Sequence, residues 1–149
     1  MVKILKIDAK ETYAIRHEVL RPGRPLEERI FAGDDEYTTF HLGVYEEENL
    51  VGIASFVVDE NRFFTGSQYR LRGMAVLPAY RGKDYGKKLI AEGEKILRER
   101  GVTVLWFNAR EIAVGFYEKL DFKIVGEPFE IPTVGLHYVM YKKLKQKSG

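Results

Sequence analysis

The sequence predicts a mixed α/β fold of the α+β kind, with one central sheet of about seven strands and flanking helices. Two observations lead to this prediction. In the first half of the chain, β-rich runs follow one another across short polar turns, and from residue 69 onward such runs alternate with segments of helical periodicity. The chain has 149 residues and no internal repeat, which suits one compact core. We therefore expect a single domain spanning residues 1–149.

The first half is expected to form a strand, a helix, a loop and a hairpin. Arg21-Pro22-Gly23 ends the helix, because proline cannot continue it. The polar turn Glu46–Asn49 separates two β-rich runs, which is typical of a hairpin. The expected elements are the strand Val2–Ile7, the helix Lys10–Leu20, the loop Arg24–Glu36 with one short helix, and the strands Thr38–Tyr45 and Leu50–Asp59.

The second half is expected to alternate strands with helices. The run Val102–Phe107 is almost continuously apolar, as in a strand buried on both faces. Gly101 stands where a helix ends in a left-handed residue. Asn108 precedes Glu111 by three residues, the spacing of a capping box at a helix start. The expected elements are the strands Tyr69–Leu77, Val102–Phe107, Phe122–Val125 and Leu136–Leu144, the last two joined by a Pro-containing loop, and the helices Asp84–Arg100 and Ile112–Leu120.

Composition excludes several classes of protein. The formal net charge of +2 is too small to indicate a nucleic-acid binder by itself. Cysteine is absent, so disulfides and thiolate metal sites are excluded. The N-terminal stretch MVKILKIDAKE is too charged for a signal peptide, and no run approaches 18 apolar residues. We expect a cytoplasmic protein with no bound metal and no membrane partner.

The stretch PAYRGKDYGKKLI, residues 78–90, places two glycines and several cations at the start of a helix. A helix N-terminus presents unpaired backbone N–H groups and about half a positive charge, so it attracts phosphate. Cations there oppose the helix dipole, which favours an anion site over a merely solvated first turn. The P-loop spacing and the G-x-G-x-x-G pattern of dinucleotide sites are both missing, so these two designs are excluded.

These residues resemble the signature of the GCN5-related N-acetyltransferases. That signature, Arg/Gln-x-x-Gly-x-Gly/Ala between a strand and a helix, corresponds here to RGKDYG, residues 81–86. Order and spacing agree with the family from Tyr69 to Glu127. The RHEVL helix, the following GDD and the late His137 are similar to the small bacterial ElaA-like acetyltransferases.

The resemblance implies the acyl-CoA N-acyltransferase (GNAT) fold, in which two parallel strands splay apart around the pantetheine of acetyl-CoA, the cosubstrate. It implies that Met74, Ala75 and Val76 offer backbone groups to the pantetheine. It places Asn108 near the pantetheine and Tyr117 near the sulfur. The residues implied for the pyrophosphate are Arg81, Gly82, Lys83, Asp84, Tyr85, Gly86 and Lys87.

Two aspartates depart from the family pattern. Asp84 and Asp121 stand where the family usually has glycine. Aspartate tolerates a left-handed backbone better than most residues, so the shape of both turns should survive. A carboxylate about 7 Å from a phosphate costs roughly 2 kcal/mol at an effective dielectric near 20, before salt screening. We therefore expect Asp84 to point to solvent and to weaken binding of coenzyme A without abolishing it.

The implied reaction is direct attack of a primary amine on the thioester, since no cysteine is present to form an acyl-enzyme. Tyr117 is the expected general acid, although it also suits the edge of an apolar helix stripe. His137 is the candidate general base, on the face of the last strand that holds Val139 and Tyr141, and a structural role is its alternative. His17 and His41 have weaker claims.

Alternative functions remain open at this point. A domain of the same fold could bind coenzyme A as a sensor or partner module without turnover. A nucleic-acid module using Arg81–Lys88 and the tail Lys142–Lys147 is the less favoured alternative. The acceptor is a small-molecule or peptide amine that the sequence does not identify, and the aromatic content leaves room for a homodimer interface. Substrate choice is expected in the irregular stretches Arg21–Glu36, Glu60–Ser67 and Glu127–Gly135, and the charge run Asp34-Asp35-Glu36 is expected to be solvated.

Overall fold

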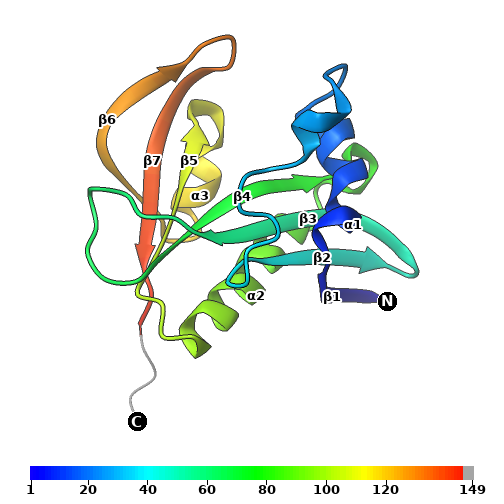
Figure 1. The fold of residues 1–149 in the computed structure, drawn as a ribbon, viewed down its shortest axis with the longest axis horizontal. Coiled ribbons are helices and arrows are strands. Elements are labelled where there is room, and N and C mark those ends of the chain that lie inside the picture. The colour runs from blue at the N-terminus through cyan, green and yellow to red at the C-terminus, as the bar shows by residue number, and fades with distance from the viewer. Residues whose placement is uncertain (146–149) are drawn as a thin grey trace. The chain divides into compact units, whose positions relative to one another are not determined.

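The computed structural model describes residues 1–145, and within them seven strands form one mixed sheet in the order β1-β2-β3-β4-β5-β7-β6 (Figure 1). The strands are β1 (Val2–Ile7), β2 (Phe40–Glu46), β3 (Asn49–Val58), β4 (Gln68–Val76), β5 (Val104–Arg110), β6 (Lys123–Ile131) and β7 (Gly135–Lys143). The α-helices are α1 (Ala9–Ile15), α2 (Tyr85–Glu99) and α3 (Val114–Glu118). The short helices are η1 (Arg16–Leu20), η2 (Leu26–Arg29), η3 (Pro78–Tyr80) and η4 (Glu111–Ala113). The predicted seven-stranded α/β architecture is confirmed.

The chain divides into two compact units. Unit 1 comprises Met1–Val58 and Leu71–Ile96, and unit 2 comprises Asp59–Arg70 and the chain from Leu97 onward. The single domain therefore stays a prediction. Among the described residues, no helix combines the length and the apolar character that a membrane crossing requires.

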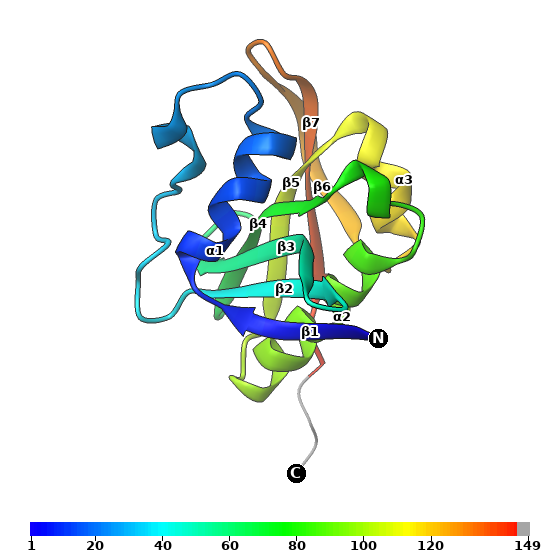
Figure 2. The same ribbon diagram turned by 90° about the vertical axis from the view of Figure 1, so that its right-hand side faces the viewer.

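Unit 1 is a meander of β1, β2 and β3 with a helix packed on each face (Figure 1 and Figure 2). On one face, Ile15 of α1 forms a buried cluster with Ile53 and Ala75. On the other face, α2 approaches β3 so closely that a Cβ added to Gly93 would lie 2.1 Å from the ring of Phe56. Side chains of a strand alternate between faces, so neighbouring residues of β3 serve both helices.

The first helix has the predicted extent, but its last turn is wider than an α-helix. The backbone N–H of Arg21 donates to the carbonyl of Arg16 at 3.0 Å, which closes a π-helical turn. π-Turns are rare and often occur at functional or strained positions. Here the turn begins at Arg16, a charged residue whose side chain is fully buried.

A buried ion pair joins this turn to the loop after η2. Arg16 donates from its two terminal nitrogens to both carboxylate oxygens of Asp34, at 2.7 and 2.9 Å, and also to the hydroxyl of Ser55 at 2.8 Å. Burial alone would raise the pKa of Asp34. The hydrogen bonds from Arg16 and from the backbone N–H of Phe31, together with the Arg16 charge, outweigh burial and hold that pKa below its ordinary value. The expectation that the charge run at 34–36 is solvated is therefore wrong for Asp34, because its partner lies 18 residues away.

The network continues to β4. His41 lies 2.7 Å from the Ser55 hydroxyl, and the Arg16 guanidinium stacks 3.9 Å from the centre of the Phe31 ring. A Cβ added to Gly73 would lie 2.8 Å from that ring, and Gly73 has a φ of 61°. Two causes therefore exclude a side chain at Gly73: the strain of a left-handed backbone and a clash with the Phe31 ring. Gly73 immediately precedes Met74, so the network packs beneath the strand implied to hold the pantetheine.

Unit 2 contains the start of β4 and the strands β5, β7 and β6. The parallel pairing of β4 with β5 joins only three residues of each strand, Gln68–Arg70 and Val104–Trp106. Such an early end of pairing is what the resemblance implies for a splayed pair. Strand β7 then pairs antiparallel with both β5 and β6. One face of this sheet forms a core of Val104, Trp106 and Val139 with Phe64, Val125, Phe129 and Tyr141.

Three sequence expectations for unit 2 are wrong in detail. Asn108 does not cap a helix: β5 continues to Arg110, and Asn108 is paired with Val139 of β7. The following helix is short, and Ile112, expected on its buried stripe, is 91% exposed. Strand β6 runs on to Ile131 through Pro128, where a loop was expected. An irregularity in its pairing between Val125 and Phe129 accommodates the proline, which cannot donate to the ladder.

Candidate active site

The predicted phosphate loop lies at an open helix start in unit 1. After β4 and η3, residues 81–84 are all exposed, and α2 begins at Tyr85. Gly82 has a φ of 82°, and a Cβ added there would meet nothing within 4 Å. The loop directly before α2 is therefore exposed and has free space beside Gly82. This geometry suits an anion, because the helix dipole and the unpaired donors act together.

The loop is anchored to β4, which precedes it, and to β3. The backbone N–H of Leu77 donates to the carbonyl of Val51 at 2.9 Å, and the Arg81 Nε donates to the carbonyl of Val76 at 3.2 Å. Ala75 is buried in the core cluster, whereas Met74 and Val76 are partly exposed. The structure thus brings together Met74–Val76 and the cationic loop, which the sequence predicts to bind opposite ends of one ligand. Their contacts with that ligand stay a prediction.

Glu46, at the end of β2, is a further part of this site that the sequence did not indicate. One of its carboxylate oxygens accepts hydrogen bonds from the Tyr85 hydroxyl and from the Lys83 ammonium, the latter at 3.0 Å. The bond from Tyr85, followed by that from Lys83, lowers the pKa of Glu46. The same bond, with lesser contributions from burial and charge, raises the pKa of Tyr85 to about 12. Lys83 is therefore already paired, which leaves Arg81 and Lys87 as the loop cations best placed for phosphate.

Both aspartates that depart from the family pattern adopt the left-handed backbone that glycine would supply. Asp84 has a φ of 63° and Asp121 a φ of 73°, so the expectation that the two turns keep their shape is confirmed. Asp84 is exposed, as expected. The consequence for the affinity of coenzyme A stays a prediction.

Replacing Asp84 with glycine is expected to lower the Kd for acetyl-CoA about 3- to 10-fold, because a carboxylate beside the phosphates is removed. The gain should shrink as salt is added. Calorimetric titration measures it, and Asp121→Gly provides the matched control at a left-handed position outside the loop. An unchanged or higher Kd for Asp84→Gly would contradict the assumed repulsion.

Tyr117 lies in an aromatic cluster of unit 2. Its ring centre is 4.3 Å from that of Phe107, and Phe116 and Phe122 flank it at 5.1 and 6.1 Å. Burial raises the pKa of Tyr117 to about 12. A phenol with this pKa keeps its proton at neutral pH, so it can donate a proton but not accept one. A general acid must hold its proton in this way, but the raised pKa also makes Tyr117 a weaker acid than an ordinary tyrosine, and its role stays a prediction.

Asn108 lies on the opposite face of β5. It lines a pocket with Val139, while Phe107, the next residue back, packs against Tyr117. The structure therefore does not bring Asn108 and Tyr117 to one face of the strand. Asn108 lines a pocket, whereas the sequence predicts it at the start of a helix as the cap.

His137 is buried on β7 with a defined tautomer. Its Nδ1 lies 2.8 Å from the carbonyl oxygen of Gly135. Because a carbonyl can only accept, Nδ1 is the donor in this contact, which leaves Nε2 as the ring nitrogen available for the proposed proton transfer. The ring also packs on Phe129, with centres 5.8 Å apart. His17 lies at the surface near the carbonyl of Arg24, and His41 belongs to the buried Arg16 network.

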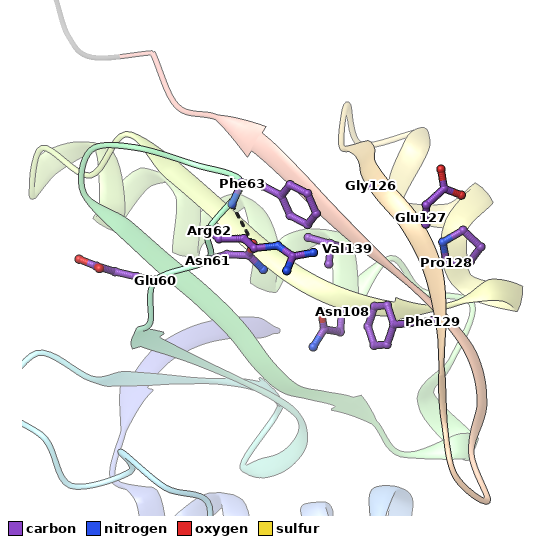
Figure 3. Close-up of a pocket in the computed structure, with 10 residues that line it drawn as sticks. All are labelled: Glu60, Asn61, Arg62, Phe63, Asn108, Gly126, Glu127, Pro128, Phe129 and Val139. Atoms are coloured by element: carbon purple, nitrogen blue, oxygen red, sulfur yellow. Dashed lines mark hydrogen bonds between the residues drawn. The ribbon is translucent and has the colours of Figure 1, made fainter.

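A pocket of about 740 Å³ in unit 2 contains parts of two stretches predicted to choose the substrate (Figure 3). Its size is that of small-molecule sites. The third stretch, Arg21–Glu36, supplies Phe31 and Asp34 to the buried network of unit 1. The residues that line the pocket are Glu60, Asn61, Arg62, Phe63, Asn108, Gly126, Glu127, Pro128, Phe129 and Val139.

The basic tail has only weak support as a nucleic-acid site. Lys142 packs over the Phe122 ring at 4.7 Å. Gln146 and Lys147 of the predicted tail lie outside the described residues.

Comparison with known proteins agrees with the fold and shows the family. The family model described as Acetyltransferase (GNAT) family matches residues 3–122. The uncharacterized N-acetyltransferase YitI of Bacillus subtilis is 44% identical over 146 residues, covering 97% of this chain and 98% of that protein.

Solved structures agree at the level of the fold. Escherichia coli ElaA superposes with a TM-score of 0.76 at 18% identity, covering 95% of this chain and 99% of that chain. An aminoglycoside 6'-N-acetyltransferase in complex with coenzyme A gives a TM-score of 0.77 at 16% identity, covering 99% of each chain. The loop at the start of α2, the seven-stranded sheet and these matches lead to one conclusion: the chain belongs to the GNAT family of acetyltransferases.

Proposed function

We propose that this chain transfers the acetyl group of acetyl-CoA to a primary amine by direct attack, with Arg81 and Lys87 at the pyrophosphate, His137 as general base and Tyr117 as general acid. The observation that supports it best is the exposed, glycine-containing loop at residues 81–84, which leads directly into the start of α2. The family uses acetyl-CoA, and a structural neighbour was solved with coenzyme A.

Each residue has a defined task in this reaction. Acetyl-CoA supplies a thioester that is already activated toward amines. His137 Nε2 accepts a proton either from the substrate ammonium before attack or from the amine nitrogen as it adds to the thioester carbonyl, directly or through water. A backbone N–H between Met74 and Val76 stabilises the negative charge that develops on the carbonyl oxygen, a contribution of about 3 kcal/mol in well-studied sites. Tyr117 donates its proton to the departing sulfur as the C–S bond breaks.

Replacing Tyr117 with phenylalanine is expected to lower kcat about 10- to 100-fold with little change in the KM for acetyl-CoA, because the ring packing stays and only the acid is lost. Steady-state release of the free thiol measures this effect. The fully exposed Tyr37 offers the matched control, Tyr37→Phe, which should retain wild-type rates. Equal turnover of Tyr117→Phe and wild type would remove Tyr117 from the mechanism.

The rival function is a module that binds coenzyme A without turnover. A panel of primary amines separates the two, since an enzyme releases thiol and acetylated product in equal amounts, whereas a sensor only binds.

We also propose that the chain acts in the cytoplasm, in line with its lack of cysteine. We further propose that the partner is a small-molecule or peptide amine and that the chain binds no nucleic acid. A homodimer is compatible with this proposal.

A further inference from the structure

The pocket of unit 2 is assembled from two segments that lie far apart in the sequence. Glu60–Phe63 belong to the connection between β3 and β4, and Gly126–Phe129 belong to the irregular part of β6. A Cβ added to Gly126, which has a φ of 75°, would lie 2.6 Å from the Phe63 ring, so the two segments pack directly on each other. The Phe63 N–H also donates to the side chain of Asn61 at 3.1 Å, which fixes the loop that carries Arg62 (Figure 3).

Arg62 extends into this pocket between Phe63 and Asn108 (Figure 3). Its guanidinium lies 5.0 Å from the centre of the Phe63 ring, which holds it over an aromatic surface. It forms no ion pair with a carboxylate of residues 1–145, whereas the nearby Arg70 pairs with Asp59 at 3.2 Å. The carboxylate of Glu127 points away from Arg62 (Figure 3). Arg62 therefore offers an unneutralised guanidinium to whatever enters the pocket.

The remaining lining combines apolar surface with carboxylates. Phe63, Pro128 and Phe129 provide the apolar wall, and Glu60 and Glu127 provide negative charge. Phe129 also packs against His137, the proposed base, with the two rings tilted by 32° and their centres 5.8 Å apart. An acceptor in this pocket thus meets an apolar surface and a guanidinium, and one residue of the apolar wall, Phe129, also contacts the buried ring of His137.

We infer that the acceptor amine also carries a carboxylate, and that Arg62 selects for it by a bidentate pair. The acceptor class is a small amino-carboxylate with an apolar body, such as an apolar amino acid. A planar guanidinium matches a carboxylate with two parallel hydrogen bonds, and the exposed Arg62 can stack on the Phe63 ring while it forms them. The inference rests on the proposed function, because it assigns the substrate of that same reaction.

The test compares matched pairs of amines in the full chain with acetyl-CoA. Each apolar amino acid, with L-phenylalanine first, is assayed beside its primary amide, and kcat/KM is measured for wild type, Arg62→Gln and the control Lys119→Gln, an exposed lysine of the same unit. For each protein, kcat/KM for the amino acid is divided by kcat/KM for its amide. The quotient for the variant is then compared with the quotient for wild type. Differences in amine basicity cancel in this comparison.

The expected result is that Arg62→Gln lowers kcat/KM for the amino acid about 10- to 100-fold and that for the amide less than about 3-fold. Lys119→Gln should change neither. Arg62→Lys should recover only part of the loss, because an ammonium cannot form the bidentate pair.

Two other outcomes would be informative in different ways. Acetylation of amines with equal loss for acid and amide in Arg62→Gln, or with preference for amines that lack a carboxylate, would overturn the role of Arg62 and leave the acetyltransferase function standing. No thiol release with any amine, despite binding of acetyl-CoA, would overturn the proposed function and this inference with it.

Discussion

Replacing Arg16 with methionine is expected to lower the free energy of unfolding by about 3 to 5 kcal/mol. The side chain of Arg16 is fully buried, and it donates to both oxygens of Asp34 and to Ser55. Methionine fills a similar volume but leaves the Asp34 carboxylate buried without its counter-charge. The main cost is therefore the desolvated charge that remains, and the lost packing is a smaller term.

Urea unfolding followed by circular dichroism measures this change. The double variant Arg16→Met with Asp34→Leu removes both charges, so it should regain a large part of the lost stability. A loss below about 1 kcal/mol for Arg16→Met alone would show that the pair does not hold the loop to η1 in the way described.

The effect also has a defined pH dependence. The pKa of Asp34 is lower in the folded chain than in the unfolded chain, so the ion pair contributes its full stability above the unfolded-state pKa. This contribution is lost as the pH falls through the folded-state pKa. The difference in stability between wild type and the double variant should therefore be constant near neutral pH and change only under acidic conditions.

Replacing Arg81 with alanine is expected to raise the Kd for acetyl-CoA about 10- to 100-fold, since a charge-assisted hydrogen bond to phosphate is lost. The fold should persist, because Arg81 is exposed. Its bond to the Val76 carbonyl couples the loop to β4, so the variant loses both the cation and part of the loop's support.

Calorimetric titration at two salt concentrations tests this prediction. Arg81→Ala should show a shallower dependence of Kd on salt than wild type, because fewer charges meet the phosphates. Lys95→Ala, a change at an exposed lysine further along α2, is the control and should behave like wild type. Equal affinity for Arg81→Ala and wild type would exclude Arg81 from the anion site.

Elements with strong local signals could be predicted from the sequence. The strands of the meander, the stripe of α2 and the left-handed Gly101 after it all occur where expected, with Gly101 at a φ of 75°. The exposed loop before α2 was also predictable, because its glycines, its cations and the helix that follows are contiguous; its binding of phosphate stays a prediction. The left-handed backbone of Asp84 and Asp121 was predictable as well, because aspartate tolerates this conformation better than most residues.

Features that depend on distant partners were not predictable. Asn108 and Glu111 have the spacing of a capping box, but pairing with β7 extends β5 through Asn108 to Arg110. Glu46 accepts a hydrogen bond from Lys83, which lies 37 residues further along the chain, and no local sequence pattern indicates this pair. The pocket around Arg62 combines several separate segments of the chain. The sequence could indicate irregular stretches that choose the substrate, but it could not indicate which of them form one pocket.

The most direct test of the account follows the backbone amides at the start of α2 by NMR during titration with coenzyme A. If these N–H groups bind the pyrophosphate, the amide resonances of Gly82, Tyr85 and Gly86 shift in a saturable way with one common Kd. Those shifts should be strongly reduced in Arg81→Ala. Saturating coenzyme A that leaves these amides unmoved would contradict the claim that this helix start is the phosphate site.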